Sequence, residues 1–292
     1  MKRYKIVLLI LALPLFFGVE RFCRWQTGGF RPSKVTCHLP HTFHHPVAPI
    51  SPGLIEEINK TLEEPFTFLG RGVQCYAFVS QDGTTVLKLF KHHHFGLPSD
   101  LLNFLPLKWA QNVIQKRNQR LHHIYKSAVI ASTRLKEESG TLYLHLEKTP
   151  GLHPLVTVHD KLKSAYPLDL NDCEFVLQKR ARPAREVINE QLVRGSVDGA
   201  LRSIFALLKL TRLQSELGIK NKDPQVLDNC GFCDSKPLLI DIGSLKMRSR
   251  STNPDPTGKA IFKAKRQILH WIEKKHPSQL SHIEEALNEK DT

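Results

Sequence analysis

A short apolar segment that ends in an aspartate is the part of this sequence best suited to chemistry. Residues 238–245 read LLIDIGSL, so an apolar strand delivers Asp241 into an Ile-Gly turn, eighteen positions after Asp223. A carboxylate at the end of a buried strand needs a partner or a metal ion, because an unpaired charge away from water is costly. Carboxylate oxygens are also ligands that Mg²⁺ takes in proteins. The segment therefore predicts a metal-binding role for Asp241. An exposed aspartate at a strand end in a turn is the alternative explanation.

Two further oxygen-bearing side chains follow Asp223 closely. The stretch IKNKDPQVLDNCGF places Asp228 five positions and Asn229 six positions after that aspartate. Either side chain offers an oxygen ligand to magnesium, so either could share a metal ion with Asp241. Turn and cap chemistry around Pro224 is the alternative explanation for the aspartates of this stretch.

A glycine-rich turn and a strand lysine lie upstream of these residues. In LGRGVQCYAFV, Gly70 and Gly72 would let backbone N–H groups approach phosphate oxygens with no side chain in the way. Lys88 follows in TTVLKLF, on a predicted strand. The glycines thus join strand to strand, which excludes a P-loop or a Rossmann unit, where they lead into a helix. An ordinary tight turn is the alternative explanation for the two glycines.

Along residues 66–245, the glycine-rich turn comes first, then the strand lysine, the Asp223 stretch and the Asp241 segment. This order of motifs resembles that of a divergent bacterial member of the protein kinase-like superfamily. The resemblance implies that the chain binds ATP with Mg²⁺ and transfers the γ-phosphoryl group. It assigns the nucleotide phosphates to Gly70, Gly72 and Lys88, the role of catalytic base to Asp223, and the metal to Asn229 and Asp241. Asn229 is preferred to Asp228 because NCGF then resembles the strand entry of the family.

The chain also departs from the pattern of the superfamily. Cys75 stands where a third glycine is expected, and Asn221 replaces the histidine of the catalytic loop. The candidate helix over residues 107–125 offers glutamines but no acid to pair with Lys88. A hydrogen bond from an uncharged side chain would hold the lysine less firmly than an ion pair. These departures favour a weakly active or inactive relative.

The elements that must position these motifs fall into two groups. Strands are predicted over residues 66–69, 76–80, 85–90, 128–135, 141–146, 156–158, 166–170, 174–178 and 237–240. Helices are predicted over residues 54–62, 107–125, 197–217, 262–275 and 280–287, with Gly218 as a C-cap. A strand-rich part before a helix-rich part indicates an α+β fold with two lobes. We expect a kinase-like N-lobe over 54–182 and a small helical C-lobe over 183–292.

The N-terminus reads as a signal or anchor segment, residues 1–25. Basic residues precede the apolar run 6–19, which at 14 residues suits a secretory signal or an uncleaved signal-anchor better than a full membrane span. The positive flank would keep the N-terminus cytoplasmic, with the body membrane-anchored or secreted. A buried helix is the alternative, against which Pro14 argues. The proline-rich residues 26–53 read as an extended tether.

Composition and charge limit the classes of partner that the chain can bind. The chain has 292 residues, of which 41% are hydrophobic, enough for a folded core. Its formal net charge of +14 favours anionic partners such as phosphorylated ligands, a phospholipid surface or nucleic acid. The basic residues are scattered, however, and no aromatic residues alternate with them as in a platform for single strands. The sequence therefore does not predict a specific nucleic-acid site.

Cys230 and Cys233 form a C-x-x-C motif. It could be a disulfide, a redox pair or half of a metal site. A disulfide would fit an exported chain, because disulfides persist in oxidising compartments.

Three functions are compatible with the sequence. The first is an exported or membrane-anchored phosphotransferase that uses ATP and Mg²⁺, with an unknown phosphate acceptor. The second is a pseudokinase that acts as a binding module for a protein partner. The third is a basic membrane-surface protein whose C-x-x-C forms a structural or redox disulfide.

Overall fold

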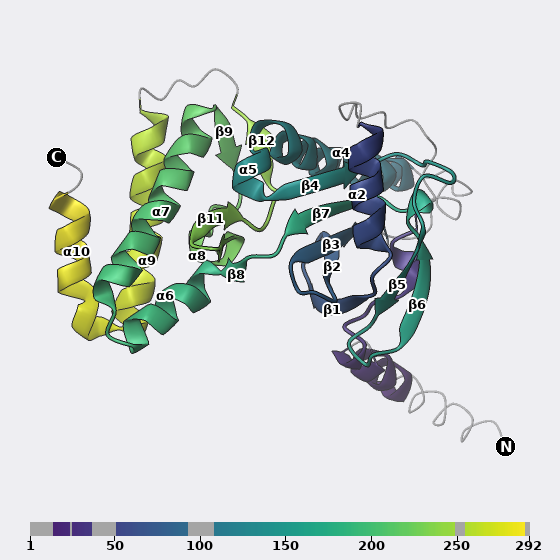
Figure 1. Ribbon diagram of the computed structural model, residues 1–292, viewed down its shortest axis with the longest axis horizontal. Helices are drawn as coiled ribbons and strands as arrows, with labels where there is room; N and C mark the ends of the chain where they lie inside the picture. Colours follow the sequence, from purple (N-terminus) through teal and green to yellow (C-terminus); the bar gives the residue numbers. More distant parts are fainter. Residues whose placement is uncertain (1–13, 24, 37–50, 93–107, 249–254, 290–292) are drawn as a thin grey trace. The chain divides into compact units, whose positions relative to one another are not determined.

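The computed structural model describes residues 14–23, 25–36, 51–92, 108–248 and 255–289 (Figure 1). Helices and strands are mixed along the chain, which confirms the α+β class. The chain forms two compact units: Met1–Pro98 with His145–Phe175, and Ser99–Leu144 with Val176–Thr292. Among the described residues, 108–144 thus fall in the second unit, whereas the sequence groups them with the N-lobe.

The first unit is built on a sheet, with helix α2 (Pro52–Leu62) and the helical residues 14–23 in the same unit. Its other elements are η1 (Pro32–Lys34), β1 (Phe66–Arg71), β2 (Cys75–Ser80), β3 (Thr85–Phe90), β5 (Leu155–His159), β6 (Ala165–Asp169) and η3 (Leu170–Asp172). The strands follow the order β3-β2-β1-β5-β6, in which only β1 and β5 are parallel. Gly83, at a φ of 75°, provides the turn between β2 and β3 that the sequence predicts.

Residues 28–36 belong to the core of the first unit rather than to a tether. Phe30 and Val35 are buried, and the Phe30 ring packs edge-on against the rings of Tyr76 and Phe78 at centroid distances of 5.3 and 4.9 Å. The Tyr76 hydroxyl also donates a hydrogen bond to the Gly29 carbonyl at 2.7 Å. Burial of these aromatic rings outweighs the extended character that the prolines suggest. Residues 37–50 of the predicted tether lie outside the described ranges.

The second unit combines small sheets with a group of helices. Its elements are α4 (Lys108–Arg134), α5 (Lys136–Ser139), β4 (Thr141–His145), β7 (Phe175–Lys179), β8 (Arg182–Pro183), α6 (Ala184–Val193), α7 (Val197–Glu216), β9 (Ile219–Asn221), α8 (Val226–Asn229), β10 (Cys230–Cys233), β11 (Lys236–Leu239), β12 (Leu245–Met247), α9 (Pro256–Lys275), η4 (Pro277–Gln279) and α10 (Leu280–Glu289). A three-stranded sheet has the order β11-β10-β8, and β12 pairs with β9. Helices α7, α9 and α10 pack side by side (Figure 1).

One predicted strand is wrong. Residues 128–135, expected as a strand, form most of the last two turns of α4 and the residue that follows. Ala128 and Ala131, one helical turn apart, are both buried. The Thr133 hydroxyl donates to the Val129 carbonyl at 2.7 Å, as hydroxyls within helices commonly do. Packing of one helical face therefore overrides the strand preference of the β-branched residues here.

The N-terminal segment is described only from residue 14 onward, where residues 14–23 are helical. Within the described ranges, no helix combines the length and apolar character needed to cross a bilayer. Residues 6–13 of the predicted anchor run lie outside those ranges.

Candidate functional site

The glycine-rich turn between β1 and β2 is tied to the end of β3 by a lysine. The Gly72 N–H donates to the Cys75 carbonyl at 3.0 Å, which closes the turn. The buried Lys91 ammonium donates to the Gly72 carbonyl and lies 4.2 Å from the centroid of the Tyr76 ring. Lys91 thus positions the turn, although no spacing in the sequence distinguishes it from an ordinary strand-end residue.

The fold itself does not require glycine at either position of this turn. A Cβ added at Gly70 or Gly72 would meet no described atom within 4 Å, and neither residue has a positive φ. Alanine would therefore fit both positions without strain. If glycine matters here, the reason lies in something that approaches the backbone from outside.

Lys88 lies in the same row of the sheet as this turn. Gly70 on β1 and Lys88 on β3 both pair with Ala77 on β2. Directly paired residues on adjacent strands share a face of the sheet, so Lys88 projects on the face that Gly70 leaves open. Its side chain is half-buried. The first unit thus brings Gly70 and Lys88 together, with Gly72 in the adjoining turn.

In the second unit, Asn229 fastens the loop of Asp223 to the turn of Asp241. The Asn229 side-chain amide donates to the Asp223 carbonyl at 2.7 Å. Its backbone carbonyl accepts from the N–H groups of Ile240 and Asp241, at 2.7 and 3.1 Å. Asn229 is itself buried, so its bonds fix the two chain segments relative to each other. The loop and the strand end therefore form one hydrogen-bonded unit.

Both aspartates present their carboxylates to solvent. The Asp223 N–H donates to Oδ1 of Asn221 at 3.0 Å, so Asn221 shapes the loop from the position expected for histidine. Asp241 accepts a hydrogen bond from the Gly243 N–H at 2.9 Å. Asp241 is thus an exposed residue in a turn, which was the alternative to a carboxylate at a buried strand end. Its charge is hydrated without a metal ion.

Asp228 points to a different partner. Its two carboxylate oxygens accept from Nε and Nη2 of Arg185 at 2.7 and 2.8 Å, a bidentate ion pair at the surface. The geometry therefore groups Asn229, and not Asp228, with Asp223 and Asp241. Asn229 leaves its side-chain Oδ1 without a donor among the described residues, so an oxygen ligand is available at this position.

Ser127 of α4 holds the turn that follows Asp241. Its buried hydroxyl donates to the Ile242 carbonyl and accepts from the Leu245 N–H. Sequence patterns could not identify this residue, because the turn lies more than a hundred positions away along the chain.

We expect Ser127→Ala to lower the free energy of unfolding by about 1–3 kcal/mol, since a buried N–H and a buried carbonyl lose their partner. Urea unfolding measures this change. The matched control is Ser132→Ala, whose half-buried hydroxyl bonds only to the Val129 carbonyl of its own helix. The control should change stability by less than about 0.5 kcal/mol. Equal effects for the two variants would contradict a positioning role for Ser127.

The C-x-x-C motif does not form a disulfide in the structure. Cys230 and Cys233 are free and stand at opposite ends of β10. Positions three apart in a strand face opposite sides and lie about 10 Å apart, beyond the reach of a disulfide. Burial raises the pKa of Cys230 to about 12, and burial with the nearby Asp234 carboxylate raises that of Cys233. Such thiols also lack the low pKa of a redox pair.

Comparisons with known proteins give no family assignment. No protein-family model matches the chain, and no curated protein matches it. The solved structures that show a likeness include a 2.2 Å crystal structure of WbdD and a medium-resolution structure of "the bifunctional kinase-methyltransferase WbdD". Each has a TM-score of 0.35 and 12% identity over 67% of this chain. The likeness covers 35% and 34% of the WbdD chains, so this chain spans about a third of their length.

Proposed function

We propose that the chain is a kinase-like phosphotransferase that binds ATP with Mg²⁺ and transfers the γ-phosphoryl group to an acceptor. The observation that carries this proposal is the hydrogen bonding of Asn229, which joins the loop of Asp223 to the turn of Asp241. In the kinase-like superfamily, an acid on a loop and an acid in a following turn have complementary roles, one toward the acceptor and one toward the metal. The bonds of Asn229 support the same arrangement here.

The residues of the second unit are suited to hold magnesium. Asp241 has an exposed carboxylate, and Asn229 keeps its side-chain oxygen available. Both are hard oxygen donors of the kind that Mg²⁺ takes together with water and phosphate oxygens. Bound there, magnesium would neutralise charge that develops on the phosphoryl oxygens.

Asp223 is the proposed base. Its exposed carboxylate accepts the proton of the acceptor hydroxyl while the new oxygen–phosphorus bond forms. The bond between the γ-phosphorus and the bridging oxygen breaks, and ADP leaves with the electron pair. Both backbone groups of Asp223 are hydrogen-bonded, to Asn221 and Asn229, so the loop holds the residue in place without using its side chain.

In this proposal, Gly70, Gly72 and Lys88 contact the nucleotide phosphates. Three observations support this role: Gly70 and Lys88 share a face of the sheet, the space over both glycines is open, and Lys91 holds the turn through the Gly72 carbonyl. Attachment to a membrane, or export, through residues 6–19 is part of the proposal and rests on the sequence alone.

One observation favours the pseudokinase alternative. Helix α4 carries no aspartate or glutamate in its 27 residues, so it has no carboxylate to pair with Lys88. In the superfamily, a glutamate of the corresponding helix pairs with this lysine and must be in place for transfer. Nucleotide binding without transfer to any acceptor would select this alternative.

Gly72→Ala tests the proposed nucleotide contact separately from the fold. We expect the affinity for Mg·ATP to fall at least about tenfold, because a methyl group would stand between the backbone and a phosphate oxygen. The free energy of unfolding should stay the same or rise by about 0.4–1 kcal/mol, since alanine fits this backbone and restricts the unfolded chain. Calorimetric titration and urea unfolding measure the two quantities.

The matched control is Gly53→Ala in α2. A Cβ there also meets no described atom within 4 Å, and the residue has no positive φ. This variant should bind Mg·ATP like the unmodified chain. Unchanged nucleotide affinity in Gly72→Ala would contradict the assignment of the glycine-rich turn.

A further inference from the structure

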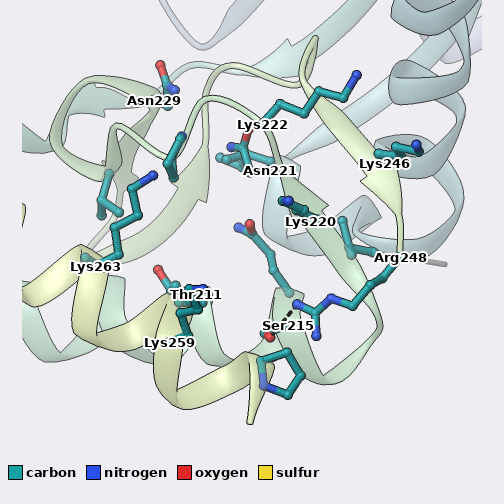
Figure 2. A pocket seen from close by; sticks show the side chains of 18 of the residues that line it. Thr211, Ser215, Lys220, Asn221, Lys222, Asn229, Lys246, Arg248, Lys259 and Lys263 are labelled. Carbon is teal, nitrogen blue, oxygen red and sulfur yellow. Dashed lines mark hydrogen bonds between the residues drawn. The ribbon is translucent and has the colours of Figure 1, made fainter. Parts of the chain in front are cut away.

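A cavity of about 600 Å³ lies within the second unit, beside the loop of Asp223 (Figure 2). Its walls come from β9 and the loop after it, from β12, and from α7 and the first half of α9. The cationic residues that line it are Lys220, Lys222, Lys246, Arg248, Lys259 and Lys263. Figure 2 shows Lys259 and Lys263 on the α9 side and Arg248 on the β12 side.

The positive charge of this cavity is not neutralised within the described part of the chain. No aspartate or glutamate is among the described residues that line it. Its five lysines form no ion pair with the described residues, and the Arg248 guanidinium donates to the Ser215 hydroxyl at 3.0 Å rather than to a carboxylate. A concave surface lined by one sign of charge concentrates its field and attracts counter-ions.

Two pairs of these lysines are placed where like charges cost stability. Lys220 and Lys246 are directly paired across β9 and β12. Like charges at directly opposed strand positions are destabilising. Lys259 and Lys263 stand four positions apart on α9, where like charges also repel. Each pair is therefore a repulsion that the fold does not need, and an anion bound close to Lys259 and Lys263 would relieve the one on α9.

Burial and the lysines of the cavity both lower the pKa of a neighbouring histidine, His123. His123 of α4 has a lowered pKa, because of burial first and then the charges of Lys222, Lys246 and Lys126. The positive potential therefore extends from the β9 and β12 side of the cavity into the adjacent helix.

We propose that this cavity binds a compact ligand that carries two or more phosphate groups on a small polyol. A phosphate monoester has a charge of about −1.5 to −2 at neutral pH, and lysine ammonium groups bind it as point charges. A volume of about 600 Å³ lies in the range of small-molecule sites. Apolar side chains with exposed surface, Met247 and Pro224, also line the cavity and would contact the carbon skeleton of the polyol. The ligand is either a free polyol phosphate or the phosphorylated headgroup of a lipid. This binding does not depend on phosphoryl transfer.

The test is calorimetric titration of the full chain with inositol hexakisphosphate, without Mg²⁺ and at physiological salt. The unmodified chain should bind with a Kd in the micromolar range. The double variant Lys259→Gln with Lys263→Gln should weaken binding at least about tenfold, with stability equal or higher because a repulsive pair is removed. The matched control is Lys274→Gln with Lys275→Gln, an exposed pair at the far end of α9 that should leave the Kd unchanged.

Asn229, the proposed metal ligand, also lines the cavity, so the two proposed sites adjoin each other. Asp241→Ala distinguishes them, because Asp241 is not among the described residues that line the cavity. It should leave the binding of inositol hexakisphosphate unchanged. Absence of binding, equal losses in the two lysine variants, or loss in Asp241→Ala would each overturn the proposal.

Vesicles distinguish the two sources of the ligand. Binding to vesicles that contain phosphoinositides, but not to vesicles with the same charge supplied by phosphatidylserine, would identify a lipid headgroup. Binding of inositol hexakisphosphate without vesicle binding would identify a soluble ligand. Equal binding to the two kinds of vesicle, with no binding of inositol hexakisphosphate, would show that the chain binds anionic membranes through its charge alone. That result would overturn the proposal.

Discussion

Asp223→Asn should lower the rate of phosphoryl transfer by about 10²- to 10⁴-fold and leave the affinity for Mg·ATP within about twofold. An asparagine cannot accept the proton of the acceptor hydroxyl, and the base does not hold the nucleotide. The fold should tolerate the change, because the hydrogen bonds of Asp223 to Asn221 and Asn229 come from its backbone. Transfer of labelled γ-phosphate to any acceptor, including the chain itself, measures the rate.

The matched control for this variant is Asp198→Asn. Asp198 is an exposed aspartate of the same unit, in the first turn of α7. The Asp198→Asn variant should transfer phosphate at the same rate as the unmodified chain. A normal rate in Asp223→Asn would show that another group is the base. If the unmodified chain binds Mg·ATP but transfers nothing, the pseudokinase alternative applies.

Asp241→Ala should lower the Mg²⁺-dependent affinity for ATP at least about 100-fold, because a charged metal ligand is lost from a site with few protein ligands. The free energy of unfolding should change by no more than about 1 kcal/mol, since Asp241 is exposed and water can replace its bond to the Gly243 N–H. Titration of ATP at saturating and at zero Mg²⁺ separates metal-dependent binding from the rest.

Asp228→Ala is the matched control for Asp241→Ala. It removes the surface ion pair with Arg185, which should cost at most about 1 kcal/mol. It should leave the Mg²⁺-dependent affinity unchanged, because Asn229 and not Asp228 is bonded to the Asp223 loop. A loss in Asp228→Ala equal to that in Asp241→Ala would reassign the second metal ligand to Asp228.

Local patterns in the sequence predicted the elements that carry the candidate residues. β1, β2 and β3 begin and end within two residues of the predicted strands, because apolar runs and the Gly83 turn define them locally. Helix α7 and its cap at Gly218, with a φ of 71°, also agree with the prediction. In each case neighbouring residues are sufficient to specify the element.

The errors arose where distant contacts decide the structure. The strand predicted over residues 128–135 is helical because Ala128 and Ala131 are buried on one face of a helix that begins much earlier. The predicted tether is partly folded because Phe30 packs against Tyr76 and Phe78, more than forty positions away. Local composition contains no information about either contact.

The same limit applies to the candidate site. The motifs of the sequence predicted Asp223, Asn229 and Asp241 as site residues, with Asp228 as the alternative to Asn229. The hydrogen bonds of Asn229 and the ion pair between Asp228 and Arg185 depend on the tertiary fold. The basic cavity could not be predicted either, because Lys220 and Lys222 join it from a part of the chain more than twenty positions before its other cationic residues.

The melting temperature of the unmodified chain with ATP, measured with and without Mg²⁺, tests the proposed nucleotide site most directly. A ligand at a hundred times its Kd stabilises the folded state by about 2.7 kcal/mol, which corresponds to a shift of roughly 5–10 °C for a protein of this size. We expect such a shift with millimolar ATP and Mg²⁺, most of which should disappear when the metal is omitted. No shift from a well-folded sample under the same conditions would contradict the proposal that this chain binds Mg·ATP.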